Sequence, residues 1–246
     1  MLVPGLHLLE TEMEGFDVRS AVLPGDAGTV VWDTLAHPDQ MAPARALVRA
    51  RPSTVVYSHA DWDHAWGTCG LADVEEVVAH EASLARFKSD VPEELARRRA
   101  SDGPVWDAVR LIAPTRTFAA SLTLEMGSTT LELHALAGHT PDSIVGFVPD
   151  WGVLLAGDAV ETPLPVVNDP RSVGRWISGL EAWMADGRVK VVVPSHGPVG
   201  GPELLDRTAA YLRALVQGRR ARPAADLSPF YRETHEANVR LLSERG

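Results

Sequence analysis

The chain has 246 residues, of which 45% are hydrophobic and 23% charged, and its formal net charge at neutral pH is −10. This composition excludes a disordered or fibrous chain and supports a sizeable buried core. The acidic balance argues against nucleic acid as a partner, because phosphate binding needs clustered Lys and Arg. We therefore expect the partner to be a small-molecule substrate.

The chain has one cysteine, Cys69, so an internal disulfide is excluded. The N-terminal segment MLVPGLHLLETEMEG lacks the positively charged region that opens a signal peptide. No apolar stretch approaches the roughly 20 residues that span a bilayer. We expect a cytoplasmic protein without membrane association, and the sequence does not indicate its oligomeric state.

The first half opens with short β-type runs separated by Gly and Pro turns, which is typical of a meander. Helical spacing of apolar residues and further β-branched runs follow. The predicted strands are 5–9, 18–23, 28–33, 54–57 and 74–79, and the predicted helices are 40–50 and 80–88. Residues 92–116 are charged and partly helical.

The second half repeats this rhythm. Its predicted strands are 116–119, 122–126, 129–136, 144–148, 152–156 and 189–193, and its predicted helices are 171–186, 202–218 and 229–244. Two such halves, packed sheet against sheet with helices outside, make an α/β fold of four layers, an αββα sandwich. No segment has the composition of a linker, so we expect residues 1–246 to form a single domain.

The segment SHADWDH, residues 58–64, directly follows the predicted strand 54–57. It places His59, Asp61, Asp63 and His64 within six consecutive positions. Imidazole and carboxylate groups at this density are typical of a metal site, and few structural roles require them.

Three single candidates follow other predicted strands: His139, Asp158 and His196. A lone histidine, or a lone Gly-Asp after a strand, is usually structural. Open α/β sheets, however, gather their ligands at the carboxyl ends of their strands. The three residues together with SHADWDH therefore predict one shared metal site.

This set resembles the metallo-β-lactamase-fold hydrolases, whose pattern is H-x-H-x-D-H, then Gly-His, then Gly-Asp, then a late Ser/Gly-His. Asp33-Thr34 is similar to the end of a strand in that family. GHTPDS at 138–143 is similar to its Gly-His-Thr-Pro-Gly-Ser, with Asp142 in place of a glycine. The resemblance covers about residues 5–218 and implies the four-layer fold and a two-metal centre, but it does not define the substrate.

Carried over position by position, the resemblance implies seven metal-binding side chains. They are His59, Asp61 and His139 for the first metal, Asp63, His64 and His196 for the second, and Asp158 as the bridge between the two. The resemblance also makes Asp63 and Asp158 the candidate catalytic residues. Asp63 would orient the attacking water, and Asp158 would hold the two metals together.

Asp61 departs from the family pattern, which usually has His at this position. An added carboxylate makes the centre less positive and favours harder metals. We expect two divalent ions, zinc first, with iron or manganese as alternatives because of Asp61. The flavodiiron branch of the family carries Glu here and binds iron, but this chain has no room for the flavodoxin domain of that branch. Asp is also shorter than Glu or His, so Asp61 reaches the first metal only if its loop moves inward, or it does not reach the metal at all and the first site is damaged.

The leading functional expectation is a metal-dependent hydrolase of a small ester, thioester or lactone, as in the glyoxalase II-like members of the family. Three alternatives remain: a non-haem iron oxidoreductase of the same fold, a phosphodiesterase, and a non-catalytic binding protein with a degraded metal site. Specificity is expected from loops at the cleft rim, at 92–116 and 162–172, and from Trp62. Residues 222–246 would either cap the fold or contact another chain.

Overall fold

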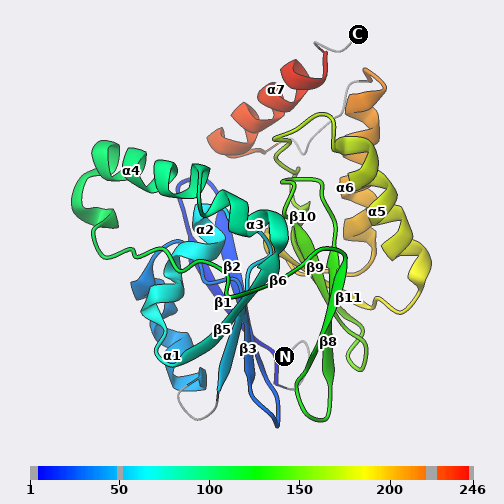
Figure 1. The fold of residues 1–246 in the computed structure, drawn as a ribbon. Helices are drawn as coiled ribbons and strands as arrows, with labels where there is room; N and C mark the ends of the chain where they lie inside the picture. The colour runs from blue at the N-terminus through cyan, green and yellow to red at the C-terminus, as the bar shows by residue number, and fades with distance from the viewer. Residues whose placement is uncertain (1–4, 49–51, 220–225, 244–246) are drawn as a thin grey trace.

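The computed structural model describes residues 5–48, 52–219 and 226–243 (Figure 1). Two β-sheets in this part of the chain pack face to face. The first sheet has six strands in the order β1-β2-β3-β4-β5-β6, and the second has five in the order β11-β10-β9-β8-β7. Both sheets mix parallel and antiparallel pairs, because each half begins as a meander and then turns to β-α connections.

The strand bounds follow the β-type runs of the sequence. The first sheet consists of β1 (His7–Glu12), β2 (Asp17–Pro24), β3 (Thr29–Trp32), β4 (Ser53–Val56), β5 (Val74–His80) and β6 (Arg116–Phe118). The second consists of β7 (Ser121–Glu125), β8 (Thr130–Ala135), β9 (Ile144–Val148), β10 (Val153–Glu161) and β11 (Val191–His196).

Helices cover the outer face of each sheet (Figure 1). On the side of the first sheet lie η1 (Pro38–Met41), α1 (Ala42–Val48), α2 (Trp62–Ala65), η2 (Trp66–Gly70), α3 (Glu81–Arg86), α4 (Asp90–Asp102) and η3 (Gly103–Trp106). On the side of the second lie α5 (Val173–Asp186) and α6 (Glu203–Val216), and α7 (Pro229–Ser243) crosses one end of the molecule. The predicted four-layer αββα sandwich is therefore confirmed.

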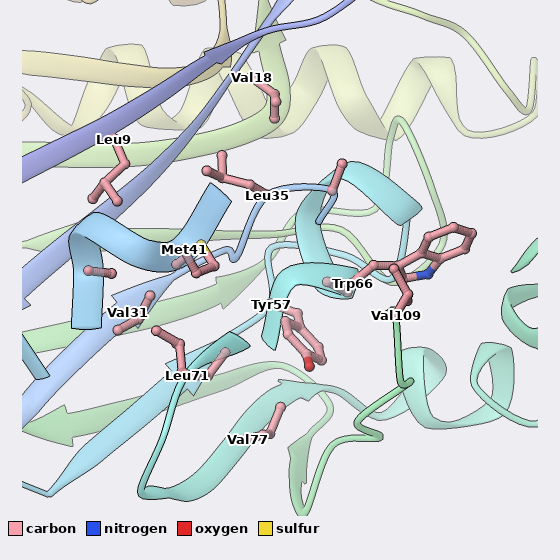
Figure 2. Close-up of a cluster of buried hydrophobic side chains, with 14 of the residues drawn as sticks. Leu9, Val18, Val31, Leu35, Met41, Tyr57, Trp66, Leu71, Val77 and Val109 are labelled. Carbon is pink, nitrogen blue, oxygen red and sulfur yellow. The ribbon is translucent and has the colours of Figure 1, made fainter. Parts of the chain in front are cut away.

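Three apolar clusters separate the four layers. Figure 2 shows the cluster between the first sheet and its helices. Leu9, Val18 and Val31 from the strands belong to it, together with Met41 and Trp66 from the helical segments. A second cluster fills the space between the sheets, and a third lies between the second sheet and the α5–α6 pair. Burial of this apolar surface supplies most of the stability of such a fold.

The two sheets touch directly where β4 ends. The backbone N–H of Ile144 donates to the carbonyl of Ser58 at 2.8 Å. Gly157 lies opposite, at a shift in the β10–β11 register, with a φ of +52°. A Cβ at this position would lie 2.8 Å from the Cβ of Ser58, so only glycine permits this approach.

The structure corrects three expectations about the elements around SHADWDH and its partners. β10 continues to Glu161 instead of ending at 156, because the irregularity at Gly157 bends the strand without ending it. β11 likewise runs on to His196. Asp158 and His196 therefore lie within strands, not after them. α2 was not predicted, since four residues are too few to show a helical period.

The segment at 92–116, whose sequence pattern is charged and partly helical, forms most of α4 together with η3. The expected helix at 40–50 is split into η1 and α1, and its last residues lie outside the described part of the chain. Among the described residues, no helix combines the length and apolar character that crossing a membrane requires.

Gly157→Ala is expected to lower the free energy of unfolding by about 1–3 kcal/mol. The new methyl group would overlap Ser58, and the positive φ of this position is unfavourable for alanine. Denaturant titration measures the change. Gly174→Ala is the matched control: a Cβ there meets nothing within 4 Å, and alanine favours the helix. Equal stability of the two variants would contradict the close approach of the sheets.

Candidate metal centre

SHADWDH forms the turn that connects β4 to α2. Ser58 and His59 lie just beyond the end of β4, and Asp61 is the N-cap of α2. Asp63 and His64 occupy the short helix itself, which turns both side chains back toward the ends of the strands. The density of polar residues in this segment thus reflects a single tight turn at the edge of the first sheet.

The second sheet supplies the other three predicted residues. His139 lies in the loop between β8 and β9, Asp158 in β10 and His196 at the end of β11. Gly138 precedes His139, and a Cβ there would lie 2.3 Å from the ring of Trp176. Glycine at this position lets the loop rest against α5 and brings His139 over the sheet edge.

Six of the seven predicted side chains form two buried groups. The potential ligand atoms within each group lie within 4.8 Å of one another; the groups are His59, His139 and Asp158, and Asp63, His64 and His196. We name them the first triad and the second triad. The pairing of histidines matches the sequence expectation, with Asp158 counted in the first triad.

Asp158 lies between the two triads. Its Oδ2 is 3.6 Å from Nε2 of His139 and 3.2 Å from Nε2 of His196. Its Oδ1 is 3.4 Å from Nε2 of His64. One carboxylate therefore faces imidazoles of both groups, which is the position required of a bridging ligand.

Hydrogen bonds at Nδ1 orient all four imidazoles of the triads. The bonds are His59 Nδ1 to Ser58 Oγ (3.0 Å), His64 Nδ1 to Asp33 Oδ2 (2.9 Å), His139 Nδ1 to the Val166 carbonyl (3.0 Å) and His196 Nδ1 to the Asp17 carbonyl (2.6 Å). With Nδ1 donating, each neutral ring presents its Nε2 lone pair to the centre. Such partners are typical of histidines that bind metal.

Asp33 anchors this arrangement from the end of β3. Its carboxylate is fully buried and accepts bonds from the Ser58 backbone N–H and Oγ, both at 2.7 Å, as well as from His64. Because Ser58 Oγ donates to Asp33, it accepts from His59. The Asp-Thr strand end noted in the sequence therefore orients histidines of both triads.

The donor set fits divalent cations. Among the described residues, Nε2 of His59, Nε2 of His64 and Oδ1 of Asp158 are buried without a hydrogen-bond partner. Buried polar atoms are normally satisfied. Mixed nitrogen and oxygen donors that converge in this way are the usual surroundings of a catalytic metal ion.

Asp61 lies beside the first triad. Its Oδ2 is 3.4 Å from Nε2 of His59 and 3.3 Å from Nε2 of His139, and its Oδ1 is 2.7 Å from Nη2 of Arg86. The shorter side chain thus lies close to two imidazoles of the first triad, although it is not a member of that triad.

The carboxylates of the centre raise the pKa of three of its histidines, His64, His139 and His196. Burial alone lowers the pKa of His196, but the charge and hydrogen bond of Asp158 outweigh it and raise the pKa to about 10. Burial likewise opposes the effect of Asp61 and Asp158 on His139, whose pKa rises to about 9. Without bound cations His139 and His196 therefore favour the protonated form, and metal ions would displace these protons.

Arg19 on β2 fixes the chain around His196. Its Nη1 donates to the carbonyls of Pro194 and Gly197, at 2.5 and 2.9 Å, and the side chain is buried. No sequence pattern indicated this role, because the contact joins positions far apart in the chain.

A cleft of about 430 Å³ lies over the centre. Its floor contains residues of both triads, and its walls are largely apolar. The wall residues are Met13, Phe16, Trp62, Trp106, Val166 and Phe230, with Arg98 stacked 3.9 Å from the centre of the Trp62 ring. The predicted rim segments and Trp62 do line the cleft.

Two parts of the wall were not predicted. Met13 and Phe16 come from the β1–β2 turn, and Phe230 comes from α7. The rings of Phe230 and Phe16 are tilted by 35°, with centres 4.7 Å apart. Phe16 and His196 form an edge contact, with ring centres 5.4 Å apart. α7 therefore packs against its own chain, as the capping role considered for 222–246 requires of residues 226–243.

Glu161, also missed in the sequence, closes the inner end of the cleft. It is buried, and its Oε2 accepts from the Val166 N–H at 3.1 Å. Burial raises the pKa of Glu161 to about 7, against the opposing effect of His196. It was overlooked because β10 was expected to end before it.

A four-layer sandwich with His and Asp side chains gathered at the edge of both sheets is the metallo-β-lactamase fold. A sequence profile of the Metallo-beta-lactamase superfamily matches residues 14–230. The chain belongs to this superfamily.

Known relatives are distant. The chain is 26% identical to a metallo-beta-lactamase type 2 of Bacillus sp. (strain 170) over 188 residues, 74% of this chain and 66% of that enzyme. It is 27% identical to a hydroxyacylglutathione hydrolase of Anaeromyxobacter dehalogenans (strain 2CP-C) over 139 residues, 55% of this chain and 42% of that enzyme. The chain thus spans about two thirds or less of the length of these relatives.

Solved structures share the fold at low identity. A metallo-beta-lactamase family protein from Thermus thermophilus superposes with a TM-score of 0.69 at 18% identity, covering 88% of this chain and 82% of that protein. The likeness establishes the architecture, and the reaction has to be argued from the site.

Asp33→Asn is expected to weaken metal binding about 10- to 100-fold, because it removes the charge that holds His64 Nδ1 and Ser58. Equilibration in metal buffers followed by elemental analysis measures the affinity. Asp39→Asn is the control, since the Asp39 side chain is 86% exposed and remote from the triads. Unchanged affinity in Asp33→Asn would show that the histidines do not need this anchor.

Proposed function

We propose that the chain is a metal-dependent hydrolase that cleaves a small ester, thioester or lactone with a pair of divalent cations. The observation that carries this proposal is the position of Asp158 between two buried triads, directly beneath an apolar cleft. A purely structural metal site would be closed, whereas this one opens to a space large enough for a small substrate.

In this proposal His59, His139, Asp61 and Asp158 would hold the first cation, and Asp63, His64, His196 and Asp158 would hold the second. When bound, such a pair supplies a water of lowered pKa and Lewis-acid polarisation of the scissile carbonyl. Zinc suits the histidine-rich donors, and iron or manganese suits the added carboxylate.

The residues of the chain have separate tasks. Asp63 borders the cleft and lies 3.6 Å from Nε2 of both His64 and His196, a position from which its carboxylate can orient the attacking water. Asp158 fixes the spacing of the two triads. Asp33 and Ser58 keep the imidazoles in place through Nδ1.

The cleft walls favour a substrate with an apolar part. Phe16, Trp62, Trp106 and Phe230 offer flat apolar surfaces, and Arg98 supplies a cation at the rim, where Glu94 accepts from its Nε at 2.7 Å. Aromatic walls bind acyl or thioether groups by contact and exclude water. The relation to a hydroxyacylglutathione hydrolase supports a thioester or ester substrate.

One observation favours a second candidate, a non-haem iron oxidoreductase. Asp61 brings a further carboxylate to the first triad, and carboxylate-rich surroundings suit iron. The identity of the bound metal and the reaction it supports separate this candidate from the hydrolase.

Protein purified without added metal is expected to contain about two metal ions per chain and to hydrolyse members of an ester, thioester and lactone panel. A chelator should remove the activity, and added zinc, manganese or iron should restore it. Two ions without any hydrolysis would contradict the proposal, and iron with turnover of oxygen or a persulfide would favour the oxidoreductase.

Asp158→Ala is expected to reduce kcat by more than about 100-fold and to lower metal content, because the group shared by both triads is lost. The control is Asp150→Ala, an exposed position in the β9–β10 turn. Retained activity in Asp158→Ala would exclude the two-metal mechanism.

Phe230→Ala is expected to raise KM about 5- to 20-fold with little change in kcat, since it removes apolar contact with the substrate but leaves the triads intact. Initial rates over a range of substrate concentrations measure both constants. Val239→Ala on the exposed face of α7 is the control. A KM equal to that of the unaltered protein would show that α7 does not contribute to substrate binding.

A further inference from the structure

Arg86, the last residue of α3, connects three carboxylates next to the first triad. Its Nη2 donates to Asp61 Oδ1 at 2.7 Å, and its Nη1 donates to Asp142 Oδ1 at 3.0 Å. Its Nε and Nη2 both donate to Asp90 Oδ2, at 2.9 and 2.8 Å. Every nitrogen of the guanidinium thus has a carboxylate partner, and four of its five N–H groups are used in these bonds.

The two carboxylate oxygens of Asp61 have different partners. Oδ1 is held by the guanidinium, and Oδ2 is turned toward Nε2 of His59 and His139, at 3.4 and 3.3 Å. A carboxylate held by one oxygen cannot rotate freely, so the other oxygen stays directed at the first triad. Planar guanidinium groups are well suited to this kind of fixation.

Asp142 holds Arg86 in position from the opposite side. It is fully buried, and its Oδ2 accepts from the Ala60 N–H at 2.9 Å and from Ser83 Oγ at 2.7 Å. Asp142 thus ties the SHADWDH turn to α3. Asp61 and Asp142 are also the two positions at which the motifs of this chain depart from the family pattern, and a single arginine contacts both.

The charges around the first triad support the same role for Arg86. Asp61, Asp63 and Asp158 place three carboxylates around the centre, and their mutual repulsion is reduced only where a positive charge lies close by. Arg86 supplies a permanent positive charge on the outer side of Asp61, at a side-chain exposure of 19%. A partly buried pair of this kind is costly to break by removing one partner.

We infer that Arg86 is a positioning residue that makes Asp61 a working ligand of the first metal. The inference rests on the two-cation centre of the proposed function. Asp61, Asp142 and Arg86 then form one functional unit. Neither of the two aspartates that depart from the family pattern would support metal binding without the arginine.

Arg86→Met in the unaltered chain and in Asp61→His tests the inference. Metal affinity is measured by competition with a chromophoric zinc chelator, without substrate, and thermal melting checks that each variant is folded. In the unaltered chain, Arg86→Met should lower the affinity for one of the two zinc ions about 10- to 100-fold and leave the affinity for the other unchanged. In Asp61→His the same substitution should change zinc affinity less than about 3-fold, because a neutral imidazole needs no counter-charge.

Controls separate this role from a general effect on the fold. Asp90→Asn removes the negative charge of a half-exposed partner of Arg86 that does not contact the triads. This variant should bind both zinc ions with unchanged affinity. If Arg86→Met fails to fold, Arg86→Gln carries the same comparison with the same expected results, because glutamine removes the charge and keeps an amide that can donate hydrogen bonds.

Wild-type affinity for both ions in Arg86→Met, or an equal loss in Asp61→His, would overturn the inference. So would an unaltered chain that binds a single ion. Two tightly bound ions without hydrolysis would contradict the proposed reaction alone, since these measurements involve no substrate.

Discussion

The concentration of buried carboxylates at one edge of both sheets is the constraint on which the rest of the structure depends. Asp33, Asp63, Asp142 and Asp158 are all buried there, close to one another. Such a group of charges is tolerated only if hydrogen-bond donors and positive charges surround it. The chain supplies imidazoles, backbone N–H groups and the guanidinium of Arg86, and the triads provide places for cations. The short helix α2, the bend in β10 and the anchoring of His196 all serve to bring these partners to the carboxylates.

Most of the architecture was predictable because it follows local patterns. β-branched runs and helical spacing located the strands and the helices α5, α6 and α7, and their order indicated the four layers. The errors in the predicted strand and helix bounds lie where the local sequence is compatible with more than one structure or is too short to indicate any. Gly157-Asp158 has the composition of a turn, yet pairing with β11 carries β10 through it. α2 has too few residues to show a period, and tertiary contacts rather than propensity form it.

The residues of the centre were predictable to a similar extent. The sequence grouped all seven candidates, and the structure brings them together, with Asp61 beside the first triad rather than in it. Their roles as ligands remain a proposal. Arg86, Arg19 and Phe230 could not be found in this way, because each acts through contacts between distant parts of the chain. The departures from the family pattern at Asp61 and Asp142 were visible in the sequence, but no local pattern linked them to Arg86.

Each triad draws its members from both halves of the fold. His59 comes from the first sheet and faces His139 and Asp158 of the second, while Asp63 and His64 face His196 across the same boundary. A cation in either triad is therefore a non-covalent cross-link between the two sheets. Its binding would stabilise the packed sheets over the separated ones, since separation takes at least one member away from each triad. In a protein built this way, cation binding at the triads and the stability of the packed sheets would be thermodynamically linked.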